Sequence, residues 1–182
     1  MKINTTVINL FGGPGCGKST LAAEIFSTLK KNGVSIEFIP EFIKSVAYQQ
    51  DKTILTNPEH QQYITFNQKH LEDVLLGKVK YLITDSPFLL GAVYYNHENS
   101  KILKLYKNYL SCIFKERNTL NFFIKRDKLI KFNTSGRHLQ EKEAIEIDNK
   151  IFDILTDSEI PFYYNYYDKI YNEILKLILK DK

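Results

Sequence analysis

One short run of residues near the start of the sequence restricts the possible fold more than any other feature. It matches the pattern G-x-x-x-x-G-K-[ST] at every fixed position and reads Gly12-Gly13-Pro14-Gly15-Cys16-Gly17-Lys18-Ser19, followed by Thr20. Glycines let the backbone curl so that successive N–H groups point inward, and the helix that follows adds its positive end. An apolar, β-branched stretch, 5–11, precedes the run, and an amphipathic stretch, 19–31, follows it. This setting predicts a phosphate-binding loop formed by residues 12–20.

The polar residues at the end of this loop predict chemistry on a nucleotide with a bound metal ion. Lys18 would reach the β and γ phosphates, and the Ser19 hydroxyl would ligate Mg²⁺. Asp85 ends the apolar run 81–84, and we interpret it as the carboxylate that holds Mg²⁺ through water. A helix N-cap without a metal role is the alternative for Asp85. ATP and Mg²⁺ are therefore the expected cofactors.

The residues after Asp85 favour phosphoryl transfer over hydrolysis. Motor and switch ATPases commonly place a glutamate there to polarise water, whereas this chain has Ser86 and Pro87. A kinase has the opposite need, because an activated water would waste ATP. The sequence therefore predicts transfer of the phosphoryl group to a bound acceptor.

Three further side chains are candidates for contact with that acceptor. Glu41 follows a predicted strand and Pro40, so it would project from the carboxyl edge of the sheet and hold or deprotonate an acceptor hydroxyl; a solvent-facing helix start is the alternative. Lys44, one turn further, would pair with Glu41 or contact an anionic substrate. Gln68 would read a base or an amide of the substrate, although a plain exposed glutamine explains it equally well.

The excess of positive charge is concentrated in one segment. The chain has 25 Lys and Arg against 21 Asp and Glu, a net charge of +4, and residues 125–137 alone carry that excess. We interpret residues 125–140 as a lid that closes over the polyphosphate, with Arg137 as the cation that stabilises the transition state and Arg126 as the second. A solvated basic loop is the alternative. Since the remaining chain is nearly neutral, a nucleic-acid partner is not expected.

Strand-like and helix-like stretches alternate along the whole sequence. Strands are expected at 5–11, 34–39, 81–84, 122–124 and 161–166, and helices at 19–31, 57–76, 102–114, 141–155 and 167–179. This alternation predicts an α/β fold with a five-stranded, mostly parallel sheet and helices on both faces, as in P-loop NTPases. One domain over residues 1–182 is expected.

Composition restricts where such a protein would work. The two cysteines, Cys16 and Cys112, provide neither a disulfide framework nor metal-ligand spacing, as is typical of a reducing compartment. No apolar run approaches the 18 residues that a membrane-spanning helix requires. We therefore expect a cytoplasmic protein with no membrane partner.

These residues together resemble the small P-loop kinase-like family often labelled AAA-type ATPase/kinase of NAD metabolism, which includes ribosylnicotinamide kinase domains. The shared pieces cover most of the chain: the loop, Pro40-Glu41 with Lys44, Gln68, Thr84-Asp85-Ser86-Pro87, Gly136-Arg137, Pro161 and Tyr167-Asp168-Lys169. The loop is also similar to that of nucleoside monophosphate kinases. The chain differs from the family in having Phe132-Asn133-Thr134-Ser135 before Gly-Arg, where an acidic and aromatic stretch is usual, and Lys44 where arginine is common.

The residues and the resemblance lead to one expected activity and two alternatives. The expected activity is ATP-dependent phosphoryl transfer to a nucleoside, a nucleotide or a ribosylnicotinamide-like small molecule. A nucleotide-binding regulator or ATPase without such an acceptor is the first alternative, and a polynucleotide 5′-end kinase is the second. The absence of an Asn-Lys-x-Asp motif and of a glutamate beside Asp85 argues against a switch protein.

Overall fold

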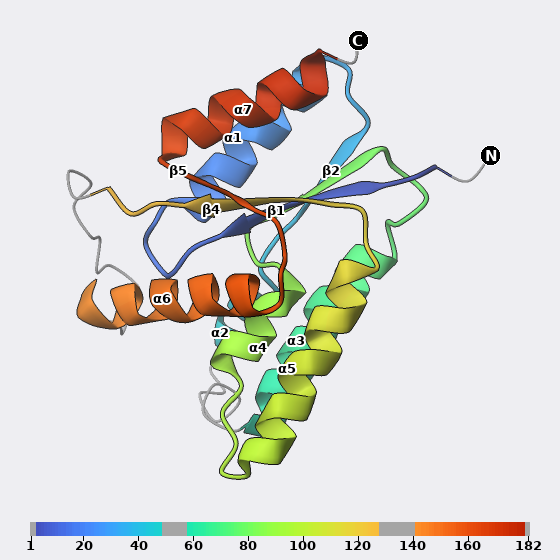
Figure 1. Ribbon diagram of the computed structural model, residues 1–182. Helices are drawn as coiled ribbons and strands as arrows, with labels where there is room; N and C mark the ends of the chain where they lie inside the picture. The colour runs from blue at the N-terminus through green and yellow to red at the C-terminus, as the bar shows by residue number, and fades with distance from the viewer. Residues whose placement is uncertain (1–2, 49–57, 128–140, 181–182) are drawn as a thin grey trace.

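The computed structural model describes residues 3–48, 58–127 and 141–180 and contains one five-stranded sheet between two layers of helices (Figure 1). The elements are, in chain order, β1 (Thr6–Phe11), α1 (Lys18–Lys31), β2 (Ile36–Ile39), α2 (Phe42–Tyr48), α3 (Pro58–Asp73), β3 (Tyr81–Thr84), η2 (Phe88–Leu90), α4 (Gly91–Tyr94), α5 (Ser100–Lys115), β4 (Thr119–Ile124), α6 (Glu141–Asp157), β5 (Tyr163–Asn165) and α7 (Tyr167–Leu179). None of the helices in these residues is long and apolar enough to cross a membrane.

The sheet brings the carboxyl ends of its central strands together. Its order is β2-β3-β1-β4-β5, and every pair is parallel. β1 pairs with β3 on one side, where Asn9 lies opposite Thr84, and with β4 on the other, where Phe11 lies opposite Phe123. The chain therefore leaves the end of β1 at a point where the strand order reverses, and such points are where open α/β sheets bind ligands.

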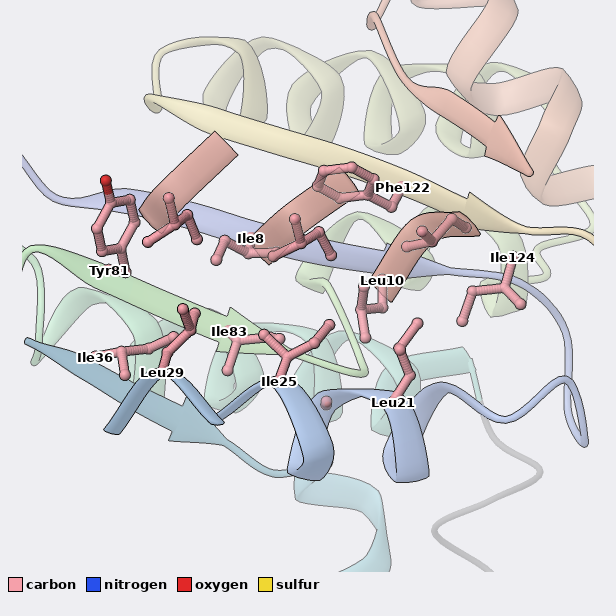
Figure 2. Packing of buried hydrophobic residues seen from close by; sticks show 14 of the residues in the cluster. Ile8, Leu10, Leu21, Ile25, Leu29, Ile36, Tyr81, Ile83, Phe122 and Ile124 are labelled. Carbon is pink, nitrogen blue, oxygen red and sulfur yellow. The ribbon is translucent and has the colours of Figure 1, made fainter. Parts of the chain in front are cut away.

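Two helices cover one face of the sheet. α1 and α7 lie side by side there (Figure 1). Leu21, Ile25 and Leu29 form a stripe on α1 at the spacing expected of an amphipathic helix, and all three are buried. Figure 2 shows this stripe against strand side chains such as Ile8 and Ile83, in one core cluster. The packing fixes the axis of α1, and with it the direction of its N-terminus.

The other helices lie on the opposite face (Figure 1). Several aromatic side chains are buried in the core there. Phe11 packs edge-on to Phe114 of α5, and Phe88 of η2 packs against the same ring. Leu155 anchors α6 in this cluster. Apolar clusters thus cover both faces of the sheet, as expected for a central strand such as β1, in which only Thr6 and the buried Asn9 are polar.

The predicted α/β architecture and its five parallel strands are confirmed, with shifts at the element ends. β4 begins at Thr119 rather than at 122, and β5 is shorter than predicted. α5 begins at Ser100 because the Asn99 side chain caps it, accepting from the amides of Lys101 and Ile102. The short elements α2, η2 and α4 are not in the sequence prediction, since they are too short to show helical periodicity.

Candidate functional site

The phosphate loop lies between the end of β1 and the start of α1. Gly12, Gly15 and Gly17 have φ angles of 139°, 83° and 91°, which side chains rarely tolerate, so the glycine pattern is a backbone requirement. The residue at the N-cap of α1 is Gly17, which has no side chain to cap the helix. The amides of its first turn are therefore available to a ligand, as they are in anion sites at helix N-termini.

Lys18 lies across the loop that it follows. Its Nζ donates to the carbonyl oxygens of Gly12, at 2.6 Å, and Gly13, at 2.9 Å. A cavity of about 320 Å³ adjoins the loop. It is lined on the loop side by residues such as Gly15, Lys18 and Ser19, and on the far side by Glu41, Lys44, Leu90 and Tyr94. The structure thus brings predicted phosphate-binding and acceptor-binding residues to one cavity.

The two predicted metal residues, Ser19 and Asp85, face a common point. Lys44 marks that point, because its Nζ lies 3.1 Å from Ser19 Oγ and 3.6 Å from Asp85 Oδ2. Asp85 is 2% exposed, and its Oδ1 has no hydrogen-bond partner in the described part of the chain. A hydroxyl and a carboxylate oxygen that already attract a cation form the hard-oxygen donor set that Mg²⁺ prefers. The residues present therefore fit a magnesium ion.

Glu41 is positioned by a buried amide. Gln68 of α3 accepts from Phe42 N, at 2.8 Å, and donates to the Pro40 carbonyl, at 3.3 Å. It is 3% exposed, so the alternative of a solvent-exposed glutamine is wrong. These two bonds fix the backbone on both sides of Glu41, while Gln68 also lines a neighbouring cavity. Contact of Gln68 with a substrate stays a prediction.

A second cavity meets the loop cavity at Glu41. Its volume is about 300 Å³, and polar lining residues such as Gln61, Thr65 and Ser86 alternate with apolar ones such as Phe88. Glu41, Leu90 and Tyr94 line both cavities. Burial of the phenol group, and then the Glu41 carboxylate, raises the pKa of Tyr94, so this phenol stays protonated. Sequence reasoning missed Tyr94, because no motif or periodic stretch includes it.

Arg126, which the sequence places at the start of the predicted lid, contacts the phosphate loop. Its Nε pairs with Asp148 Oδ2 of α6 at 2.9 Å, and its Nη2 donates to the Pro14 carbonyl at 3.0 Å. The other oxygen of Asp148 accepts from Gly13 N. Asp148 was missed as well, although an acid on the apolar face of the helix 141–155 is a recognisable signal. Arg137 and residues 128–140 of the predicted lid lie outside the described residues.

A third cavity of about 330 Å³ lies on the far side of the loop. It is lined by Gly15, Thr20 and Arg126 together with Tyr166 and other residues at the start of α7. Lys125 Nζ lies 4.9 Å from the centre of the Tyr166 ring. Flat aromatic and guanidinium groups around a cavity suit a planar ring system.

Tyr167 helps to hold this wall in place. Its hydroxyl donates to Glu24 of α1 at 2.8 Å, and its ring lies against Gly17, where a Cβ would come within 3.2 Å of it. Burial, followed by the bond to Glu24, raises the pKa of Tyr167. The start of α7 is therefore fixed against the loop and against α1.

Comparison with models of known protein families found a match to this chain. A family model described as AAA domain matches residues 7–165. A search of the curated proteins found no match.

Solved structures with a similar fold include two that are named as kinases. The NadR protein in complex with NR has a TM-score of 0.69 at 12% identity, and the match covers 95% of this chain and 51% of that one. This chain thus spans about half the length of NadR. Deoxyadenosine kinase from M. mycoides with bound dATP has a TM-score of 0.52 at 20% identity, and the match covers 96% of this chain and 98% of that one. Thymidylate kinase from Candida albicans has a TM-score of 0.55 at 14% identity, and the match covers 99% of this chain and 92% of that one. At these identities the likeness shows the fold alone.

Proposed function

The chain belongs to the AAA domain family and has a P-loop kinase fold, and from that premise we propose that it is an ATP- and Mg²⁺-dependent phosphotransferase acting on a nucleoside, a nucleotide or a ribosylnicotinamide-like small molecule. The observation that carries the proposal is the junction at Glu41. One carboxylate lines both the cavity of the phosphate loop and a second cavity of about 300 Å³, beside the point that Ser19 and Asp85 face.

The phosphate loop would hold the donor nucleotide. The amides of the first turn of α1 and the Lys18 ammonium would bind the β and γ phosphates. Ser19 and Asp85 would hold Mg²⁺, which when bound neutralises charge on the phosphate oxygens. The nucleotide base would enter the third cavity, between Arg126 and the tyrosines at the start of α7. Arg137 remains our candidate for the cation that stabilises the transferred group.

The second cavity would hold the acceptor. The hydroxyl of a nucleoside or ribosylnicotinamide-like acceptor would lie beside Glu41 and pass its proton to this carboxylate, while the hydroxyl oxygen attacks the γ phosphorus and ADP departs. In a nucleotide acceptor, a phosphate oxygen would attack in place of the hydroxyl. Tyr94 would donate a hydrogen bond from the wall that the two cavities share. The names of the neighbouring structures support an acceptor of this size, since they include a complex with NR and a deoxyadenosine kinase.

The proposal is tested with γ-labelled ATP, Mg²⁺ and a panel of nucleosides, ribosylnicotinamide and nucleoside monophosphates. We expect at least one phosphorylated product, and we expect Glu41→Gln to lower kcat by about 100-fold or more, as loss of a general base does. Glu37→Gln is the matched control, because Glu37 lies on β2 and pairs on the surface with Lys30. No product from any acceptor, or equal rates for the two variants, would contradict the proposal.

A further inference from the structure

The ammonium group of Lys44 lies where the proposed metal ion would bind. Its Nζ is 3.1 Å from Ser19 Oγ, 3.6 Å from Asp85 Oδ2 and 3.5 Å from Glu41 Oε2. Ser19 begins α1 and Asp85 follows β3, so the side chain of Lys44 reaches from α2 across the ends of two central elements. The oxygens that a divalent cation would use are therefore already in contact with a cation supplied by the chain.

The burial of Asp85 explains why a cation is needed at this point. Asp85 is 2% exposed, and a carboxylate removed from water is costly unless a positive charge or hydrogen bonds compensate it. Its Oδ1 has no hydrogen-bond partner within the described ranges, so its pairing with Lys44 through Oδ2 carries much of that compensation. Lys44 itself is half exposed, with 51% of its side-chain surface accessible, and can move away without unfolding its helix.

We infer that Lys44 is a built-in competitor for the metal site, which holds Ser19 and Asp85 together and must be displaced when a divalent cation binds. The inference rests on the proposed function. An ammonium and a divalent cation cannot occupy the same point between these two oxygens, and at 3 to 4 Å from each other the two cations repel. Binding of the metal ion is therefore weakened by whatever free energy Lys44 gains from these oxygens.

Other anionic groups lie within reach of the Lys44 ammonium once a metal ion displaces it. Glu41 lies three residues earlier on the same turn, and Lys44 also lines the loop cavity that would hold the phosphates. A bound nucleotide offers Lys44 new anionic partners, so the nucleotide would reduce the competition and make metal binding depend on its presence. The Lys44 side chain thereby links metal binding to the residue that would hold the acceptor.

Binding of Mn²⁺, followed by the electron paramagnetic resonance signal of the free ion, tests the inference. We compare the wild type with Lys44→Met, Lys44→Arg and Lys31→Met, each with and without ADP. Lys44→Met should bind Mn²⁺ about three- to tenfold more tightly than the wild type. A change of this size corresponds to the free energy of a few partly exposed ion pairs. Lys44→Arg should stay within about twofold of the wild type, because it keeps the competing charge. Without ADP the gain in Lys44→Met should be larger than with it.

Lys31→Met is the matched control, because Lys31 lies twelve residues after Ser19 on α1, about 18 Å away along the helix, and should bind Mn²⁺ like the wild type. A second measurement is the melting temperature without metal. Lys44→Met should melt below the wild type, since Asp85 loses its counter-ion, and added Mg²⁺ should raise its Tm more than that of the wild type.

The outcomes separate this inference from the proposed function. Equal or weaker Mn²⁺ binding by Lys44→Met overturns the inference and leaves a metal-dependent phosphotransferase in place. If the wild type with ADP binds no more Mn²⁺ than ADP alone, and Asp85→Asn changes nothing, the proposed metal site is wrong and the inference fails with it.

Discussion

At the scale of single residues, Asp148 shows how one carboxylate can determine the shape of the phosphate loop. It accepts from Gly13 N with one oxygen and pairs with Arg126 through the other, while Arg126 donates to the Pro14 carbonyl. Gly13 also lies close to α6, since a Cβ there would come within 2.6 Å of the Ala144 carbonyl. The first half of the loop is therefore held by contacts with α6 and with Arg126, two residues after the end of β4.

Replacing Asp148 by alanine should weaken nucleotide binding without unfolding the protein. The change removes the acceptor for Gly13 and leaves the Arg126 side chain without this partner, which we expect to reduce affinity for a non-hydrolysable ATP analogue about tenfold, or about 1.4 kcal/mol. Calorimetric titration measures it. Asp153→Ala is the control, because Asp153 lies on the same helix and is exposed. Equal affinity for the two variants would show that Asp148 does not position the loop.

Residues differ in how far their roles can be read from sequence. Lys18, Ser19 and Asp85 were identified from local spacing and from the ends of strands, and a parallel sheet is enough to bring Ser19 and Asp85 to one point. Gln68 and Asp148 act through partners 26 and 135 residues away, so no local pattern could identify these partners, even though Asp148 is recognisable as an acid on the apolar face of its helix. Arg126 was predicted because it is positively charged and lies in the basic segment. Its contact with the loop could not be predicted, because it depends on the pairing of Arg126 with Asp148 of α6.

At the scale of elements, the contact between α3 and α4 forms one wall of the second cavity. Gly91 begins α4 and lies directly against the Thr65 side chain, so a Cβ at position 91 would collide with Thr65 Oγ1 and Cγ2. Both residues line the cavity. Glycine is required here for close approach of two helices, and its helical φ of −55° would suit any residue.

Substituting Gly91 by alanine should therefore destabilise the protein by about 1 to 2 kcal/mol, because overpacking outweighs the better helix propensity of alanine. Urea unfolding measures the change. Thr65→Ala in the same chain removes the two nearest atoms, Oγ1 and Cγ2, and leaves the Cβ at 2.9 Å, so it should recover part of the loss. A single variant at least as stable as the wild type would refute the packing argument.

A buried carboxylate on α3 predicts a pH dependence of stability. Glu72 is 1% exposed and lies next to Arg117, with Asp73 and Lys69 nearby on its own helix; burial raises its pKa to about 7. Since the folded state then holds a proton that the unfolded state releases at a lower pH, the free energy of unfolding should fall as pH rises from about 4.5 to 7. This fall in the free energy of unfolding should be at most about 3 kcal/mol.

Glu72→Gln removes this titration and keeps a polar group beside Phe88 and Arg117. Its free energy of unfolding, measured in urea between pH 5 and 8, should vary less with pH than that of the wild type. Parallel pH profiles for the two proteins would mean that Glu72 titrates in its ordinary range in the folded state.

Element prediction succeeded where periodicity is long. α1, α5, α6 and α7 each bury an apolar stripe, and each was expected within a few residues. The seven residues of α2 and the four of α4 have too few turns for such a stripe, and tertiary contacts with α3 hold them instead. Both short helices carry or border site residues, so local prediction was weakest beside the site.

At the scale of the whole molecule, the parallel sheet explains why distant parts of the chain meet. The loop, Glu41 and Asp85 follow β1, β2 and β3, and the carboxyl ends of parallel strands lie at one edge. The architecture could be predicted because strand-like and helix-like stretches alternate along the sequence. The two cavities and their shared wall were not, since they depend on how helices from separate segments pack.

Binding of Mg²⁺ and ADP should stabilise the entire domain. The loop joins β1 to α1 at the centre of the fold, so a ligand there binds only the folded state. At a ligand concentration of 100 times Kd, binding should add about 2.7 kcal/mol to the free energy of unfolding. For a chain of this size we expect Tm to rise by about 5 to 10 °C. Differential scanning calorimetry measures it, and Lys18→Ala should abolish most of the shift. An equal shift in this variant would mean that the nucleotide binds elsewhere.

The fate of the γ phosphate of ATP tests the central claim most directly. Labelled ATP and Mg²⁺ are incubated with the protein, with and without the acceptor panel, and the label in acceptor, inorganic phosphate and ATP is separated by chromatography. We predict that label moves to a small-molecule acceptor and that inorganic phosphate stays at background when no acceptor is present. Label released only as inorganic phosphate, at the same rate with and without acceptors, or transferred only to the 5′ ends of oligonucleotides, would contradict the account.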